Sequence, residues 1–236
     1  YIIRTGGDPM GFEIIATVLL KQDLPYQNCQ EEIGKLISYS MLRDEQLKDL
    51  HEQPVYKYYA FDSLFPIEKD GIYKKNKIYV FHMRMIQDDF SKKIKHCLSK
   101  LENDQFRVIA TELRTFSPRF INYLYTVTPS IVTRDGGPFK PDGDLAFLKN
   151  RLEVNAEKKY KTLYGRDLES RDFIERIVVL SKSPTVTRYK GMRYLGLKLQ
   201  VYVRSDENAQ KLAALVAVAG LGEKSSSLGA GFCLIH

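Results

Sequence analysis

The sequence is poor in cysteine, has no long apolar run and has no cluster of metal-binding residues. Its three cysteines, Cys29, Cys97 and Cys233, are far apart and form no Cys-x-x-Cys pair. This spacing argues against a disulfide framework and a zinc site, and it predicts buried, reduced thiols of an intracellular protein. No apolar run approaches the roughly 18 residues of a membrane-spanning helix. No histidine and carboxylate cluster has ligand spacing, and Asp142 and Asp144 are interpreted as turn residues, so neither a metal nor a cofactor is expected.

Two sequence signals are missing near the ends of the chain. Residues 1–9 lack both the apolar stretch of a signal peptide and any periodicity, so Met10 is interpreted as the natural start and the preceding residues as a leader. Near the other end, Ser225 and its two serine neighbours have no Gly-x-Ser-x-Gly elbow around them, which argues against a serine nucleophile.

Charge is the strongest feature of the composition. The 236 residues carry a net charge of +7, and the sequence pI is about 9.1. Such a balance favours a polyanionic partner such as nucleic acid or an acidic membrane. Hydrophobic residues make up 44% of the chain, which is enough for a real core in one large domain or two ordinary ones.

The first half of the chain predicts the order β-α-β-β-α-β. Strands are expected at residues 12–20, 55–61, 77–85 and 106–113. A helix after Pro25 carries one apolar stripe, and Asp44 is the expected N-cap of a short second helix. A further helix starts at Asp88 or Asp89. This order is that of the ferredoxin-like unit when the short helix is counted with the first.

The second half is expected to repeat the unit after a boundary at Ser117-Pro118. Strands are predicted at 120–128, 173–180 and 231–235, with a hairpin or a long bent strand over 185–204. A helix over 145–164 turns an apolar face inward, and Asp206 caps the last helix. The inward residues of the first of these helices are Leu145, Leu148, Leu152, Ala156 and Leu163. The predicted fold class is therefore α+β, with tandem ferredoxin-like (RRM-like) domains over 10–116 and 117–236.

A glycine-rich segment runs from Gly220 to Phe232 and contains four glycines, three serines and Lys224. Glycines reach positive φ without penalty, so the segment can form a concave turn whose N–H groups bind an anion. The preceding helix points its C-terminus here, and its dipole opposes such binding. A helix C-cap that runs into a tight connection is an equally open reading.

His51 is the histidine best placed for chemistry, because it ends a short helix three residues before Pro54. A histidine that stabilises a helix C-terminus is the alternative. Lys57 follows at the start of the expected strand. Tyr39 would lie ~18 Å from His51 along one straight helix, so the two meet only if the chain folds back near Asp44. Otherwise Tyr39 is a partly exposed packing aromatic.

Basic and aromatic residues alternate at 73–77 and 188–194. The second segment is the better nucleic-acid candidate, because Arg188, Lys190 and Arg193 stand beside tyrosines that can stack on bases. A solvated hairpin is the alternative reading.

Together these residues resemble the CRISPR-associated endoribonucleases that cut precursor CRISPR RNA within its repeats, members of the repeat-associated mysterious protein superfamily. The segment from Gly220 to Phe232 is similar to the family's C-terminal glycine-rich loop. The segment Leu50-His51-Glu52, with Lys57 entering a strand, is the second match. The resemblance covers the chain from Phe12 onward.

The resemblance implies a fold of two ferredoxin-like halves and a role in antiviral defence. It implies catalytic roles for His51 and Lys57, while Tyr39 matches only with a two-residue shift, since Ile37 stands where some members carry tyrosine. The implied reaction needs no metal and leaves a 2′,3′-cyclic phosphate and a 5′-hydroxyl. His51 would be general base or general acid, Lys57 would stabilise the phosphorane and Tyr39 would orient or donate a proton. The expected RNA-binding residues are Gly222, Lys224, Ser225, Arg188, Lys190 and Arg193.

The expected partner is CRISPR repeat RNA in the cytoplasm, without a membrane. Proteins of a CRISPR effector complex and a second copy of the chain are further partners left open. The alternative function is a non-catalytic RNA-binding subunit of an effector complex. A third class, a ferredoxin-like module that binds a protein, predicts no salt-dependent RNA affinity.

Overall fold

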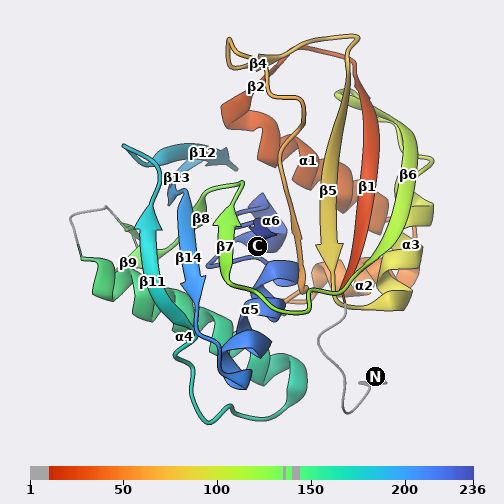
Figure 1. Ribbon diagram of the computed structural model, residues 1–236. Helices are drawn as coiled ribbons and strands as arrows, with labels where there is room; N and C mark the ends of the chain where they lie inside the picture. The colour runs from red at the N-terminus through yellow and green to blue at the C-terminus, as the bar shows by residue number, and fades with distance from the viewer. Residues whose placement is uncertain (1–10, 135–136, 140–143) are drawn as a thin grey trace.

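The computed structural model describes residues 11–134, 137–139 and 144–236, arranged as two sheets that stand side by side with helices packed against them (Figure 1). The interpretation of Met10 as the start and of Asp142 as a turn residue falls outside these residues.

The first half contains one main sheet, its helices and a small two-stranded sheet. Its elements are β1 (Gly11–Leu20), β2 (Leu24–Pro25), α1 (Tyr26–Met41), α2 (Glu45–Glu52), β3 (Tyr59–Phe61), β4 (Ile72–Tyr73), β5 (Ile78–Met85), α3 (Asp88–Leu98) and β6 (Phe106–Phe116). The main sheet is antiparallel in the order β3-β5-β1-β6, and β2 pairs with β4 apart from it. This is the strand order of a ferredoxin-like unit, as the sequence predicts.

The second half repeats the arrangement with more additions. Its elements are β7 (Tyr123–Thr126), β8 (Ser130–Ile131), β9 (Thr133–Arg134), β10 (Gly137–Pro138), α4 (Leu145–Tyr164), β11 (Ile174–Val179), β12 (Thr185–Tyr189), β13 (Met192–Leu197), β14 (Leu199–Val203), α5 (Glu207–Ala219), α6 (Ser225–Leu228) and β15 (Cys233–Ile235). The main sheet has the order β11-β14-β7-β15, which corresponds strand for strand to that of the first half. The α+β class with tandem ferredoxin-like units is therefore confirmed.

Each half has its own apolar core between sheet and helices. In the first half, Ile33, Leu36, Ile37 and Met41 of α1 are fully buried against the sheet, as the predicted stripe requires. In the second half, α4 and α5 pack beside each other and against the strands. The three cysteines are buried and free, as predicted.

Some element ends differ from the sequence predictions. The strand expected over 55–61 is confined to Tyr59–Phe61, because Tyr58 has a φ of 47° and leaves the extended conformation. Leu145, expected to face inward, is 46% exposed in the first turn of α4. Helix α3 starts at Asp88 without a side-chain cap, and its N-cap residue is Gln87.

A buried arginine joins the two halves. Arg84 of β5 pairs with Glu13 at 2.7 Å, and its guanidinium also donates to the carbonyl oxygens of Ala217, at 3.2 Å, and Cys233, at 2.5 Å. Its planar group lies 4.4 Å from the ring centre of Phe232. One side chain of the first sheet is thus bound to α5 and to β15, the last strand of the second half.

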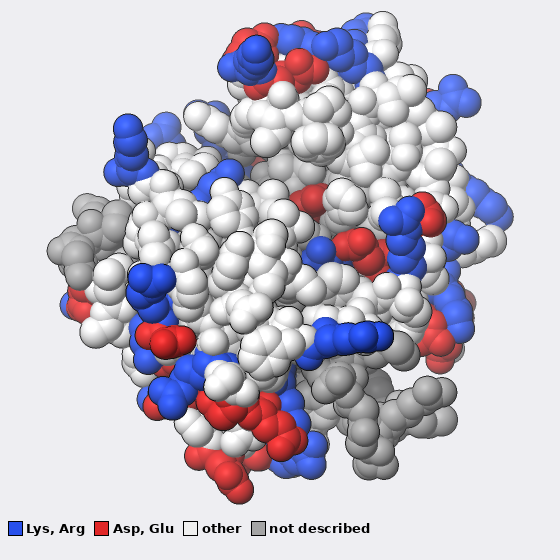
Figure 2. Space-filling model, viewed as in Figure 1, with Lys and Arg blue, Asp and Glu red and all other residues white. Residues whose placement is uncertain are grey.

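Figure 2 shows the face that the two sheets present. Residues other than Lys, Arg, Asp and Glu cover most of its centre, and charged side chains stand mainly around the margins. The positive excess of the sequence is therefore not concentrated at the centre of this face. Among the described residues, no helix combines the length and the apolar character needed to cross a bilayer.

Candidate functional site

Helix α2 holds His51 in its last turn. The helix begins where the Asp44 carboxylate accepts a hydrogen bond of 3.0 Å from the Leu47 N–H, the N-cap that the sequence predicts. It ends at Gln53, directly before Pro54. The imidazole of His51 is partly buried, and its Nδ1 atom is buried without a hydrogen-bond partner among the residues that the structure describes.

Two lysines from other segments act on His51. Burial lowers the pKa of His51 below its usual value of 6.5, and the positive charges of Lys57 and Lys190 lower it further, against the opposing charge of Glu52. Burial also lowers the pKa of Lys57. The structure thus brings His51 near two of the sequence-predicted site residues, one of them from the other half of the chain.

The hairpin β12–β13 carries Lys190 across to the first half. Lys190 has a φ of 48° at the turn, and its backbone N–H donates to the Glu31 carboxylate of α1 at 3.2 Å. Tyr189 packs against an apolar cluster that contains Leu228 and Ala230 of the glycine-rich segment. The hairpin therefore contacts both α1 and the glycine-rich segment.

Arg188 and Arg193 face each other across this hairpin. They are direct cross-strand partners, and both are exposed. Like charges at directly opposed positions destabilise a strand pair, so the two guanidinium groups repel each other.

Tyr39 is an exposed residue of α1. It is 50% exposed on α1, whereas its neighbours Ser40 and Met41 are buried. Within the described residues no hydrogen bond, ring contact or electrostatic effect links Tyr39 with His51. The role of Tyr39 stays a prediction.

The glycine-rich segment is a tightly packed connection. Gly220 is the C-cap of α5 with a φ of 82°, and Gly222, Gly229 and Gly231 also have positive φ. At Gly229, a Cβ atom would lie 2.3 Å from the carbonyl oxygen of Phe61 in β3. The segment therefore caps α5 and also packs closely against β3 of the first half. The short helix α6 within the segment was not predicted from the sequence.

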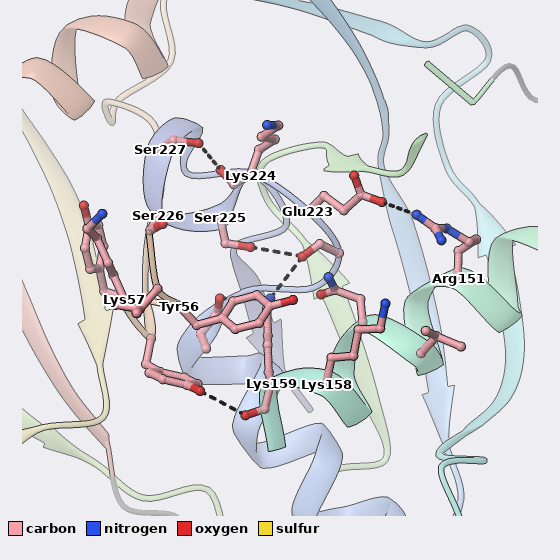
Figure 3. A pocket seen from close by; sticks show the side chains of 17 residues that line it. Tyr56, Lys57, Arg151, Lys158, Lys159, Glu223, Lys224, Ser225, Ser226 and Ser227 are labelled. Carbon is pink, nitrogen blue, oxygen red and sulfur yellow. Dashed lines mark hydrogen bonds and ion pairs between the residues drawn. The ribbon is translucent and has the colours of Figure 1, made fainter. Parts of the chain in front are cut away.

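A lysine ammonium occupies the carbonyl end of α5. Lys159 of α4 is buried, and its Nζ donates to the carbonyl oxygens of Gly220 at 2.6 Å, Gly222 at 3.0 Å and Ala219 at 3.4 Å (Figure 3). Ala219 and Gly220 are the last residue and the C-cap of α5, and a helix end leaves such carbonyls without partners within the helix. Burial lowers the pKa of Lys159 to about 7. The end of α5 thus binds a cation of the chain itself, in agreement with the direction of its dipole.

The predicted RNA-binding residues of the segment have different surroundings. Lys224 has a φ of 63° and is exposed, and its ammonium lies 5.7 Å from the ring centre of Tyr194 in the hairpin. Gly222 is buried, and Ser225 is only 6% exposed with its hydroxyl 3.5 Å from the Gly222 carbonyl oxygen. Only Lys224 of these three extends a charged group into solvent.

A cavity of about 410 Å³ lies where the two halves meet. Residues 55–59 line it from the first half, and α4 and the glycine-rich segment line it from the second (Figure 3). Its one acidic lining residue, Glu223, pairs with Arg151 at 2.9 Å and accepts hydrogen bonds from Thr133. The side chains with cationic groups in the lining are Lys57, Arg151, Lys158, Lys159 and Lys224. The cavity is therefore polar and basic.

Sequence reasoning missed Lys159 and Arg84. Lys159 follows Leu148, Leu152 and Ala156 at helical spacing, so it falls on the apolar stripe of α4, and a lysine there is a signal of a buried partner. No comparable local signal marks Arg84, whose partners lie far along the chain.

A second histidine has a carboxylate partner. The Nδ1 atom of His82 lies 2.7 Å from the Asp62 carboxylate, which raises the pKa of His82. His82 lies on β5, and neither residue lines the cavity between the halves. Across the described ranges, no three histidine, cysteine or carboxylate side chains are grouped so that they could hold a metal ion.

The fold and the site define a class: a tandem ferredoxin-like protein with a basic cavity between its two units. No family model matches the chain. A curated protein described as CRISPR-associated endoribonuclease Cas6 2, from Methanocaldococcus jannaschii, is 27% identical over 231 residues, and the match covers 90% of this chain and 94% of that protein.

Solved structures agree with this similarity. One described as a RAMP protein binding different RNA substrates has a TM-score of 0.74 at 21% identity, covering 95% of this chain and 99% of its own. A Cas6-related protein from Pyrococcus furiosus has a TM-score of 0.71 at 22% identity, covering 96% and 98%. The structural likeness establishes the shared fold. With the curated relative, it confirms the resemblance to the CRISPR repeat-processing endoribonucleases that the sequence indicates.

Proposed function

We propose that this chain is a metal-independent endoribonuclease that cuts precursor CRISPR RNA within its repeats, in the cytoplasm. Its two halves, residues 10–116 and 117–236, are the two domains of the enzyme. Similarity to a curated CRISPR-associated endoribonuclease over nearly the whole chain supports the substrate class. The observation that carries the catalytic part is the grouping of His51 with Lys57 and Lys190.

The chemistry starts at the ribose of the nucleotide before the cut. His51 takes the proton of the 2′-hydroxyl, whose oxygen attacks the adjacent phosphorus, and the bond from phosphorus to the 5′-oxygen breaks. The products are a 2′,3′-cyclic phosphate and a 5′-hydroxyl. A lowered pKa keeps His51 neutral at pH 7, which suits a general base, and such a base contributes typically ~10²–10⁴ in rate.

Lys57 stabilises the negative charge that develops on the phosphorane. Tyr39 supplies the proton to the leaving 5′-oxygen once RNA is bound. Arg188, Lys190 and Arg193 hold repeat phosphates along the hairpin, and Gly222, Lys224 and Ser225 hold the backbone beside the cavity. The opposed pair of Arg188 and Arg193 supports this assignment, because bound phosphate relieves its repulsion.

The decisive experiment is cleavage of the repeat RNA from the chain's own genome in EDTA, with end-group analysis of the products. We expect cleavage by the wild type, and loss of at least about 10²-fold in rate for His51→Ala. His96→Ala is the matched control, because His96 is an exposed histidine on α3, and it should cut like the wild type. Tight binding without cleavage by the wild type would refute the enzyme, and full activity of His51→Ala would refute the residue assignment.

A non-catalytic RNA-binding subunit of a CRISPR effector complex is the second candidate. The exposure of Tyr39, without contact to His51, favours it. This candidate predicts RNA binding by the wild type and by His51→Ala alike, with no product from either.

A further inference from the structure

We propose that the cavity between the two halves binds one unpaired nucleotide of the RNA, with its base on the ring of Tyr56 and its phosphate at Lys158 and Lys224. This inference rests on the proposed function, to which it adds a nucleotide subsite beside Lys57. The cavity volume of about 410 Å³ falls in the range of roughly 300–1,000 Å³ of small-molecule sites.

Charge in the lining favours a phosphate. Within the chain as described, neither Lys158 nor Lys224 pairs with a carboxylate, and the only hydrogen bond of the Lys57 ammonium is one of 3.4 Å to the Gln53 carbonyl oxygen. Glu223 is already engaged by Arg151. The cavity therefore collects uncompensated positive charge, which attracts an anion.

Tyr56 provides a surface for a base. Its ring is 38% exposed and lies in the middle of the cavity, between Lys57 and Lys158 (Figure 3). Its ring centre is 6.1 Å from that of Tyr58, whose hydroxyl bonds to the Lys159 carbonyl oxygen, so the neighbour is fixed to α4. An exposed ring beside cations is the arrangement on which bases stack.

Two polar atoms in the lining lack partners. The Oδ1 atom of Asn155 and the Nε atom of Arg151 are both buried and make no hydrogen bond within the described residues. Unsatisfied buried polar atoms are rare and call for an explanation. An asparagine amide both donates and accepts, so it can bind the polar edge of a base that enters the cavity. The lining thus offers lysines for the phosphate of a nucleotide, and Tyr56 and Asn155 for its base.

Fluorescence anisotropy with labelled 12-nucleotide oligo(A), oligo(U) and oligo(C) tests this assignment. Tyr56→Ala should bind all three about 10-fold more weakly, since stacking accepts every base. Tyr56→Phe keeps the ring and should stay within about twofold of the wild type, which also separates loss of stacking from misfolding. Asn155→Leu, of similar size, should change the ranking of the three oligomers. Unchanged affinity and ranking in Tyr56→Ala and Asn155→Leu would overturn the proposal.

Adenosine 5′-monophosphate as competitor distinguishes a strand from a free nucleotide. We expect displacement of oligo(A) only at concentrations far above the oligomer's own dissociation constant, because a strand adds contacts outside the cavity. Displacement at equal concentrations would assign the cavity to free nucleotides and overturn the RNA subsite.

Cleavage assays separate this proposal from the proposed function. If the wild type cuts repeat RNA and the cavity variants bind like the wild type, the subsite is wrong and the enzyme stands. If the wild type binds the oligomers with the expected variant effects and does not cut, the enzyme is wrong and the subsite stands. A wild type that binds none of the RNAs refutes both.

Discussion

The ammonium of Lys159 donates a hydrogen bond of 2.6 Å to the carbonyl oxygen of Gly220, inside the protein. The lysine therefore replaces water at the end of α5 and fixes where the glycine-rich segment leaves the helix. Because that segment lines the basic cavity together with α4, the same bond helps to set the width of the cavity.

Lys159 should give the protein a pH-dependent stability. Its pKa falls to about 7 in the folded state, whereas a lysine in the unfolded chain has a pKa near 10.5. Between pH 7 and pH 10.5 the unfolded chain binds about one proton more than the folded protein. The free energy of unfolding therefore rises with pH over this range, in proportion to that one proton. Denaturant unfolding from pH 6.5 to 10 measures it.

Lys159→Met removes the titrating group. The free energy of unfolding of the wild type should therefore rise relative to that of the variant as the pH increases from 7 to 10. The variant should also lose about 2 kcal/mol at pH 9, because the carbonyl oxygens of Ala219, Gly220 and Gly222 lose the hydrogen bonds of the Lys159 ammonium. Lys158→Met is the matched control on the neighbouring, exposed residue. Parallel stability curves for wild type and Lys159→Met would contradict the prediction.

The sequence alone was enough to predict the helix starts that are marked by an N-cap hydrogen bond between neighbouring residues. Asp44 and Asp206 cap α2 and α5 as predicted, and α4 spans the predicted residues 145–164, because a cap bonds only three residues away. The strand order of both halves also followed from the order of elements.

The remaining features depend on partners that sequence patterns do not connect. Arg84 bonds to Cys233, 149 residues away, and Lys159 to Gly220, 61 residues away. The strand expected from residue 55 fails because Tyr58 has a positive φ, which no local turn residue signals. In the candidate site, His51 and Lys57 are predictions from the sequence, whereas Tyr56 and Asn155 became visible only as the lining of a cavity.

Gly229 should be essential for contact between the glycine-rich segment and β3. In Gly229→Ala the new Cβ would lie 2.3 Å from the Phe61 carbonyl oxygen, in addition to the cost of a φ of 60°. Gly165→Ala is matched in φ, at 67°, but has no atom within 4 Å of the new Cβ. We expect a loss of ~1–2 kcal/mol for Gly165→Ala from the backbone alone. Gly229→Ala should lose a further ~1–3 kcal/mol or more from the clash, as measured by urea unfolding. Equal losses of unfolding free energy in the two variants would mean that the Phe61 carbonyl moves away from the new Cβ at no cost.

Arg84 should contribute more to stability than any surface ion pair. Arg84→Ala leaves Glu13 without its partner and two buried carbonyls without a donor, so we expect a loss of about 3–5 kcal/mol. The control is Arg114→Ala, which breaks an exposed pair with Glu112 and should leave the unfolding midpoint close to that of the wild type. If both variants unfold at the same midpoint, the bridge between the halves is not a stability determinant.

The pKa of His51 provides a direct test of the candidate site without any RNA. Burial and Lys57 lower it, whereas Glu52 raises it. Lys57→Met should therefore move the pKa of His51 upward, and Glu52→Gln should move it further down. NMR titration of the imidazole signals, with the His51 signal assigned by its loss in His51→Ala, measures both shifts. Because the folded state binds its proton at lower pH than the unfolded chain, His51 should also reduce stability as the pH falls below 6.5. Shifts of the same sign in the two variants would mean that these charges do not act on His51, and the grouping that carries the proposed mechanism would fail with them.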